Sequence, residues 1–272
     1  MSWFTRMLRN LAGFGPSETG LGRSANGASS FHLAWEMPLA TRATRLVEVS
    51  GVLEVLVPPR VQALYFWALQ VDLGDAQGVW GTGHTGLQWN PRYPGNAAIN
   101  WGGYASAMRG GAVLPGTPSA MPGFSDDPNT LAYAWLPGRP YRLRVFPSAE
   151  NPNAWRAEVT DLMPGSVQTI RELTPPPGHP SLANEGYLAR PVVWSEVFAG
   201  CEAPSVTVRW SGLQAVDEHG RVVRPEAVRV NYQTPEAGGC SNTSVAMDEA
   251  GGLLQVTSVP RLVKQGTVLK LP

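Results

Sequence analysis

Lysine is nearly absent from this 272-residue chain, in which only Lys264 and Lys270 occur. Arginine supplies the remaining basic residues, and the 21 basic side chains balance 21 acidic ones, so the formal net charge is zero. No run of five like charges occurs either. Proteins that bind nucleic acids usually carry a basic stripe, so the sequence argues against a nucleic-acid partner.

Long apolar segments are also missing. No uninterrupted apolar run approaches the roughly 20 residues that cross a bilayer, so we predict no membrane span. The N-terminus lacks the continuous apolar core and small-residue cleavage site of a secretory signal peptide. Its apolar residues instead recur at helical spacing, which predicts a short amphipathic helix: Trp3, Phe4, Met7, Leu8, Leu11 and Phe14.

The chain is predicted to have two parts. Residues 1–29 should comprise the N-terminal helix and a linker rich in Gly, Ser and Asn, and residues 30–272 should form a β-sandwich domain. The helix could dock on the body of the protein, or it could bind a membrane surface or a protein partner. The localisation stays open, because a mature form trimmed of its signal is also conceivable.

Cysteine is scarce. Cys201 and Cys240 could form one disulfide that joins two segments near the C-terminal end, or they could be two buried thiols. The sequence does not decide between these alternatives. With no CxxC motif and no nearby pair of histidines, a structural zinc site is not expected.

The composition favours an all-β fold. Charged residues make up only 15% of the chain, 43% are apolar, and 30 Gly and 25 Pro are spread along its whole length. About a dozen short strand patterns separated by turn signals, with no long helical pattern between them, predict a two-sheet antiparallel sandwich. Leu64–Leu73 and Tyr187–Phe198 should be inner strands, and Pro58, Pro59 and Pro140 should lie in turns or at strand ends.

Aromatic residues and amides gather near two glycine-rich segments, Gly81–Pro91 and Asn100–Tyr104. We expect these segments to be loops whose aromatic rings and amides bind a polar ligand with apolar faces, such as a sugar. Trp35, Trp67 and Trp210 lie in apolar strand patterns and should belong to the core. The predicted ligand-binding residues are Trp80, His84, Gln88, Trp89, Asn90, Asn100, Trp101 and Tyr104.

A family resemblance accompanies these motifs. The chain between Ser30 and Val259 resembles a family of uncharacterised, mostly extracellular bacterial proteins with a jelly-roll sandwich similar to concanavalin-type lectins and glucanases. The resemblance implies that fold, a glycan or polysaccharide partner and an extracellular location, although no signal peptide is visible. The segments that carry it are Trp67–Asp72, Gly81–Gln88, Tyr133–Trp135, Gly138–Val145 and Trp194–Phe198.

Acidic residues supply candidates for chemistry. Hydrolysis of a glycoside requires two carboxyl groups on either side of the scissile bond, and the candidates are Asp72, Glu158 and Glu196. Glu196 stands out because Trp194 and Phe198 share its face at a spacing of two residues. The composition of a calcium loop is present at Asp126, Asp127 and Asn129, although ordinary turn chemistry is the favoured explanation for these residues. No cofactor other than this possible calcium is expected.

The leading interpretation is a non-catalytic carbohydrate-binding β-sandwich, so the chain is more readily seen as a binding module than as an enzyme. The alternative is a structural or assembly protein whose N-terminal helix docks on a partner. A glycoside hydrolase with Glu196 as its acid or base is the third hypothesis.

Overall fold

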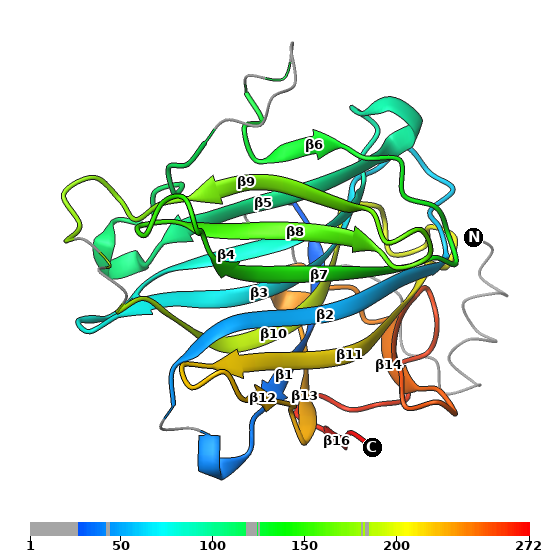
Figure 1. Ribbon diagram of the computed structural model, residues 1–272. Helices are drawn as coiled ribbons and strands as arrows, with labels where there is room; N and C mark the ends of the chain where they lie inside the picture. The colour runs from blue at the N-terminus through cyan, green and yellow to red at the C-terminus, as the bar shows by residue number, and fades with distance from the viewer. Residues whose placement is uncertain (1–26, 42–43, 118–123, 125, 181, 183–184) are drawn as a thin grey trace, which may run out of the picture.

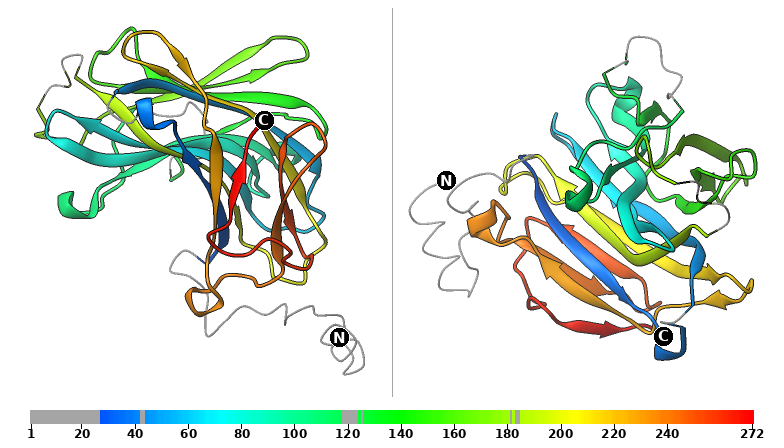
Figure 2. Two further views of the ribbon diagram at one scale, coloured as in Figure 1. Left: turned by 90° about the horizontal axis from the view of Figure 1, so that it is seen from below. Right: turned by 90° about the vertical axis from the view of Figure 1, so that its left-hand side faces the viewer.

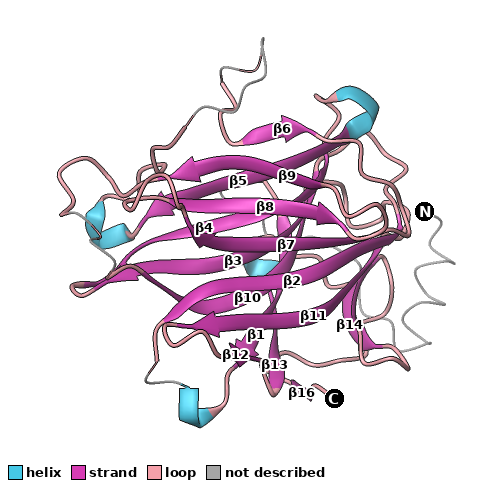
Figure 3. Ribbon diagram, viewed as in Figure 1, coloured by secondary structure: helices cyan, strands magenta, loops and turns pink. Residues whose placement is uncertain are grey.

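The computed structural model describes residues 27–41, 44–117, 124, 126–180, 182 and 185–272. The predicted N-terminal helix lies outside these residues. The described part of the chain contains sixteen strands in two layers, and its only helices are short 3-10 turns at the periphery (Figures 1 and 3). These turns are η1 (Leu39–Thr41), η2 (Pro94–Asn96), η3 (Ala107–Arg109) and η4 (Pro235–Ala237).

One layer, which we call the back sheet, contains eight strands. In their order across the sheet they are β16 (Val268–Lys270), β13 (Ala227–Tyr232), β1 (Ser29–Glu36), β10 (Tyr187–Val197), β3 (Tyr65–Asp75), β4 (Gly78–Trp89), β5 (Ala97–Ala105) and β6 (Thr130–Ala132). The strands β1 and β13 run steeply across the direction of β3 and β4, so this sheet is strongly twisted (Figures 1 and 2).

The other layer is the front sheet. Its order is β14 (Thr243–Met247), β15 (Leu253–Thr257), β11 (Thr207–Asp217), β2 (Leu46–Val57), β7 (Pro140–Pro147), β8 (Trp155–Asp161) and β9 (Val167–Leu173), with β12 (Val222–Val223) beside β11. The two sheets are joined where Leu188 of β10 pairs with Leu46 of β2. Every pairing in both sheets is antiparallel, which confirms the predicted all-β sandwich.

The predicted inner strands are confirmed. Nearly every residue of β3 is buried on both faces, and β10 lies beside it in the middle of the back sheet. The prolines also fall as expected: Pro58 and Pro59 follow the end of β2, and Pro140 begins β7, where no ladder hydrogen bond is lost. Among the described residues, no helix combines the length and the apolar character that a bilayer crossing requires.

The main core lies between the two sheets. In β1, Phe31, Leu33 and Trp35 are buried in this core, whereas His32 and Ala34 alternate with them on the opposite side. The predicted core tryptophans Trp67 and Trp210 are also buried here. A second, much smaller cluster of Phe66, Ala68 and Trp194 lies apart from the main core. By strand alternation, this small cluster occupies the opposite face of the back sheet.

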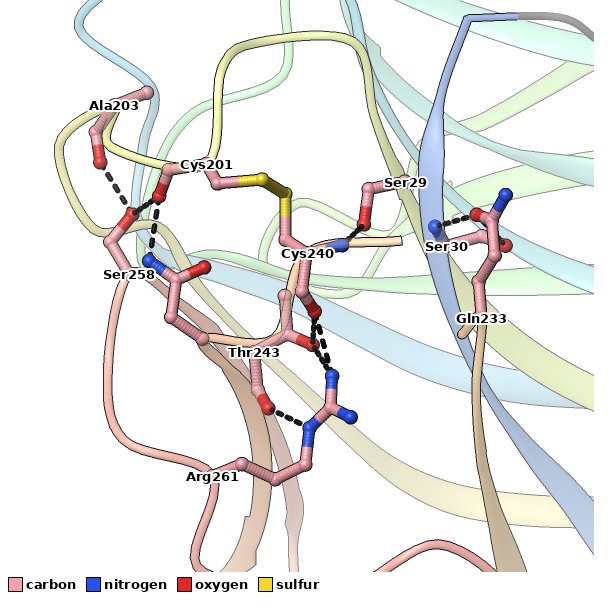
Figure 4. The surroundings of a disulfide bond; sticks show 10 residues. Ser29, Ser30, Cys201, Ala203, Gln233, Cys240, Thr243, Ser258 and Arg261 are labelled. Carbon is pink, nitrogen blue, oxygen red and sulfur yellow. Dashed lines mark hydrogen bonds between the residues drawn. A yellow bond between two sulfur atoms is a disulfide. The ribbon is translucent and has the colours of Figure 1, made fainter. Parts of the chain in front are cut away.

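A disulfide joins Cys201 and Cys240, which settles the alternative that the sequence left open. It connects the segment after β10 to the segment before β14, 39 residues further along the chain (Figure 4). Hydrogen bonds hold both sides of the bridge, because Asn242 Nδ2 donates to the Cys201 carbonyl and Arg261 Nη2 donates to the Cys240 carbonyl. The disulfide therefore fastens the end of β10 to the front sheet.

One buried amide connects the two layers. Gln255 of β15 is only 1% exposed, and its Oε1 accepts hydrogen bonds from Trp210 Nε1 at 2.9 Å and from Ser195 Oγ at 2.8 Å. Its Nε2 donates to the carbonyl of Phe31 in β1. The side chain thus satisfies groups from both sheets within a core that offers them no water.

Replacing this amide should destabilise the fold. We expect Gln255→Leu to lower the free energy of unfolding by about 2–4 kcal/mol, because it leaves several buried polar groups without partners. Urea denaturation followed by circular dichroism measures the loss. Gln168→Leu, at an exposed position of β9, is the control and should change stability by less than about 0.5 kcal/mol. Equal stability of the two variants would contradict the bridging role of Gln255.

Candidate functional site

The two glycine-rich segments are strands, not the predicted loops. Gly81–Pro91 lies almost entirely in β4, and Asn100–Tyr104 lies in β5. The glycines leave room for neighbours: a Cβ added at Gly83 would lie 2.4 Å from the ring of Trp101, and one added at Gly86 would lie 1.8 Å from the carbonyl oxygen of Trp67. Glycine is required here for close packing within a sheet, not for a turn.

The tryptophans consequently do not form a binding surface. Of the nine described tryptophans, eight are buried and Trp89 is partly buried. Trp80 and Trp101 have no exposed surface, and the indole of Trp101 donates to the carbonyl of Trp155 across the core. Trp89 packs against the main core, and its indole donates to the carbonyl of Val61. Contrary to the prediction, Trp80 and Trp101 offer no surface to a ligand, and Trp89 exposes only part of its surface.

The other predicted ligand-binding residues do come together. Four of them alternate with core residues along their strands: His84 and Gln88 in β4, and Asn100 and Tyr104 in β5. Their side chains therefore lie on the side of the back sheet that faces away from the front sheet. We call this side the outer face. Asn90 follows β4, and its Nδ2 donates to Oε1 of Gln88 at 2.9 Å.

A row of rings crosses the outer face. It connects five strands, β1, β10, β3, β4 and β5, and neighbouring ring centroids lie 5.0–6.1 Å apart. The edge-on contact of Phe66 with Trp194 is the tightest, at 5.0 Å. The row is His32, Trp194, Phe66, His84 and Tyr104. Only Tyr104, at 51% exposure, is largely open to solvent.

Amide side chains flank the rings and are held in place. Gln70 Oε1 accepts the indole hydrogen bond of Trp194 at 3.1 Å. Asn100 Nδ2 donates to Thr130 Oγ1 at 2.9 Å, whereas its buried Oδ1 has no partner among the described residues. These contacts fix the orientation of neutral hydrogen-bonding groups beside the aromatic surface.

The imidazoles on this face carry no charge at neutral pH. Burial lowers the pKa of His32 and of His84 to about 4 in each case, because the charged form loses its hydration. Both rings are therefore neutral above about pH 5. The middle of the outer face is consequently aromatic and polar but not cationic.

Glu196 adds a carboxyl group to this surface. It lies on β10, partly buried, with Ser30 of β1 as its neighbour on one side and Phe66 of β3 on the other. Gln88 of β4 is the next residue across the sheet, directly beyond Phe66. The predicted alternation holds for Trp194 and Glu196, which share the outer face, whereas Phe198 follows the end of the strand.

The other two acidic candidates lie elsewhere. Glu158 is on β8 of the front sheet, with its carboxylate 3.6 Å from the guanidinium of Arg144. Asp72 is on β3 and is bonded to Arg190, and burial raises the pKa of this carboxyl more than Arg190 lowers it. Six residues of extended strand, or about 20 Å, separate Asp72 from Phe66. No two of the three candidates flank a common point as a glycosidase requires, so these residues do not support the glycoside hydrolase hypothesis.

The predicted calcium ligands are used within the protein. Asp126 accepts two hydrogen bonds from Arg92 at 2.9 Å. Asp127 accepts from the hydroxyls of Tyr93 and Thr130, and Asn129 accepts from Arg171. In the part of the chain that the structure describes, no three His, Cys, Asp or Glu side chains gather around a possible metal position.

Comparison with known proteins finds likeness only among solved structures. No family model matches the chain, and no curated protein matches it. A structure of SCP-B, a member of the eqolisin family of peptidases, in complex with the tripeptide Ala-Ile-His matches with a TM-score of 0.44 and 12% identity, over 85% of this chain and 98% of that one. Two structures of scytalido-glutamic peptidase also match over 85% of this chain and 98% of their own chains. The structure with a peptide-based transition-state analogue matches with a TM-score of 0.42 and 12% identity. The structure with a transition-state analogue inhibitor matches with a TM-score of 0.39 and 13% identity.

These findings correct the functional interpretation. The structure supports the predicted resemblance as far as a β-sandwich, and no family model or curated protein supports its concanavalin-like part. The predictions of a non-catalytic carbohydrate-binding module and of a protein more probably without enzymatic activity are wrong on this evidence. The burial of the tryptophans also removes the observation that motivated them. With TM-scores below 0.5, the matches assign no residue roles to this chain.

A substitution that adds one methyl group to β4 tests the close packing at its glycines. We expect Gly83→Ala to lower the free energy of unfolding by about 2–3 kcal/mol, because the new Cβ overlaps the buried ring of Trp101. Thermal unfolding by calorimetry gives the change. The control is Gly200→Ala, where nothing lies within 4 Å of an added Cβ, and its stability should be nearly that of the wild type. A stable Gly83→Ala variant would mean that β4 is not packed as described.

Proposed function

We propose that this chain is a hydrolase that cleaves an amide bond of a peptide on the outer face of the back sheet. The observation that carries the proposal is the placement of Glu196 and Gln88 on either side of Phe66. Neighbouring strands are about 4.8 Å apart, so the Cα atoms of Glu196 and Gln88 are separated by about 10 Å. Two long side chains at that spacing can reach one substrate group above the ring of Phe66.

The two side chains suit opposite parts of amide hydrolysis. The carboxylate of Glu196 takes a proton from a water molecule, whose oxygen attacks the carbonyl carbon of the substrate. The Nε2 group of Gln88 donates a hydrogen bond to the carbonyl oxygen as that oxygen becomes negative. Glu196 then gives the proton to the leaving nitrogen, the C–N bond breaks, and the carboxylate is restored.

The surroundings support this assignment. The Gln88 amide is held through its Oε1 by Asn90, which leaves Nε2 as its donor. The neutral rings of Phe66, His84 and Trp194 limit hydration around the reacting groups, and hydrogen bonds to a developing charge are stronger where water is excluded.

The shape of the outer face favours a peptide. The row of rings crosses four spacings between strands, or about 19 Å, which matches five or six residues of an extended chain. Aromatic rings offer contacts for apolar side chains, and the amides of Gln70 and Asn100 offer hydrogen bonds to a peptide backbone. A single carboxyl group in the middle of this face suits amide hydrolysis better than it suits glycoside hydrolysis, which requires two.

Substitution of the two residues tests the proposal. Wild-type protein is incubated with casein and with a mixture of unmodified peptides from about pH 2 to about pH 8, and new termini are identified by mass spectrometry. We expect Glu196→Gln to lower kcat at least about 1000-fold, because it removes the acid and base. Gln88→Ala should lower kcat about 100-fold to 1000-fold, as the loss of an oxyanion donor does.

The control is Glu158→Gln, which removes a carboxylate of similar exposure from the front sheet. It should leave cleavage unchanged. Circular dichroism confirms that each variant is folded. Absence of cleavage by the wild type under every condition, or equal activity of the Glu196→Gln and Glu158→Gln variants, would reject the proposal.

A further inference from the structure

A cavity opens where β10 changes its neighbour. Leu188 pairs with β2, but from Val192 onward the same edge of β10 pairs with β1. Between these pairings the register with β3 shifts, Arg190 adopts a positive φ of 43°, and Pro191 has no N–H group to donate. The ends of β1 and β2 are thereby kept apart, and they enclose a cavity of about 560 Å³.

The walls of this cavity combine apolar side chains with charged side chains and hydroxyl groups. The apolar side chains that line the cavity include Trp35, Met37, Leu46, Leu188 and Pro191. The charged residues of the lining are Glu36, Arg45 and Arg190, and Thr41, Thr44 and Tyr187 are its residues with hydroxyl groups. A volume of this size is typical of small-molecule sites.

Among the described residues that line the cavity, the guanidinium of Arg45 has no carboxylate partner. Arg190 is bonded to Asp72 through Nε, and Glu36, the acidic residue of the lining, is bonded to Arg229. The guanidinium of Arg45 lies 6.0 Å from the centre of the Tyr187 ring and forms no ion pair with a described residue.

Glu218 is the remaining nearby carboxylate, and it accepts a hydrogen bond from the backbone N–H of Arg45 at 3.2 Å. No ion pair joins the carboxylate of Glu218 to the guanidinium of Arg45. The other two acidic groups near the cavity, Asp72 and Glu36, are paired with Arg190 and Arg229, so the guanidinium of Arg45 is the cation of the lining that has no ion pair with a described residue.

We infer that this cavity binds a small organic acid with an apolar body. Its carboxylate lies against Arg45, where a planar guanidinium can donate two hydrogen bonds to one carboxylate. Arg190 and Tyr187 belong to the same lining. The apolar body packs against Leu46, Leu188 and Pro191. This site does not involve Glu196 or Gln88, so it stands or falls separately from the proposed hydrolysis.

A matched pair of probes tests the inference. Binding of 4-phenylbutyrate and of 4-phenylbutanol, which differ in the charged group, is measured on the full chain by isothermal titration calorimetry at low salt. We expect the acid to bind at least about tenfold more tightly than the alcohol, because it gains charge-assisted hydrogen bonds. Arg45→Gln should abolish this preference, and Arg45→Lys should retain part of it.

The control is Arg142→Gln, which removes an exposed arginine from β7 of the front sheet and should leave binding unchanged. Because Arg45 is itself exposed, its substitution should not disturb folding, and circular dichroism checks this. Equal affinity for the acid and the alcohol, no binding of either, or an unchanged preference in Arg45→Gln would overturn the inference. None of these results depends on whether the protein cleaves peptides.

Discussion

The contact between the ring of Trp101 and the bare backbone of Gly83 is the constraint on which the back sheet depends. A large indole from β5 occupies the position that a side chain of β4 would otherwise fill. This packing keeps Trp101 inside the sandwich and brings β4 and β5 into the sheet beside β3. Strand alternation then directs His84 and Gln88 to the outer face. The candidate site therefore depends on the packing of Trp101 against Gly83 on the core side of the same strands.

The fold could be predicted well from the sequence, but the role of its glycines could not. Alternation in segments such as Phe31–Trp35 identifies half-buried strands directly, and the doubly apolar run of β3 identifies a central one. The segments Gly81–Pro91 and Asn100–Tyr104 look like loops because glycine is usually read as a turn former. Whether a glycine allows a turn or makes room for a ring depends on a neighbour elsewhere in the chain, which a single strand pattern does not reveal.

The candidate site was predictable only in part for the same reason. His84, Gln88 and Glu196 could be singled out from local patterns, but their arrangement depends on the register between strands that are far apart in the sequence. His32 and Phe66, which complete the aromatic row, were missed. The signal for His32 was present in the alternation of β1, where polar residues follow core residues one by one. Phe66 lies in β3, where burial on both faces hides any alternation. Tryptophan in a sequence does not distinguish the core from a binding surface, because its size suits both.

Strand β10 links the main features of the molecule. One of its ends carries Glu196 and leads to the disulfide at Cys201, and its other end bends at Arg190 beside the cavity. Its central position ties the outer face to both sheets, through its pairing with β1 and β3 and the contact of Leu188 with β2.

The most direct measurement is a crystal structure of the Glu196→Gln protein with a peptide that the wild type cleaves. Our account predicts that the scissile carbonyl lies above Phe66, within hydrogen-bonding distance of Gln88 and of residue 196. A peptide bound to the front sheet, or bound to the outer face without contact to either residue, would contradict it.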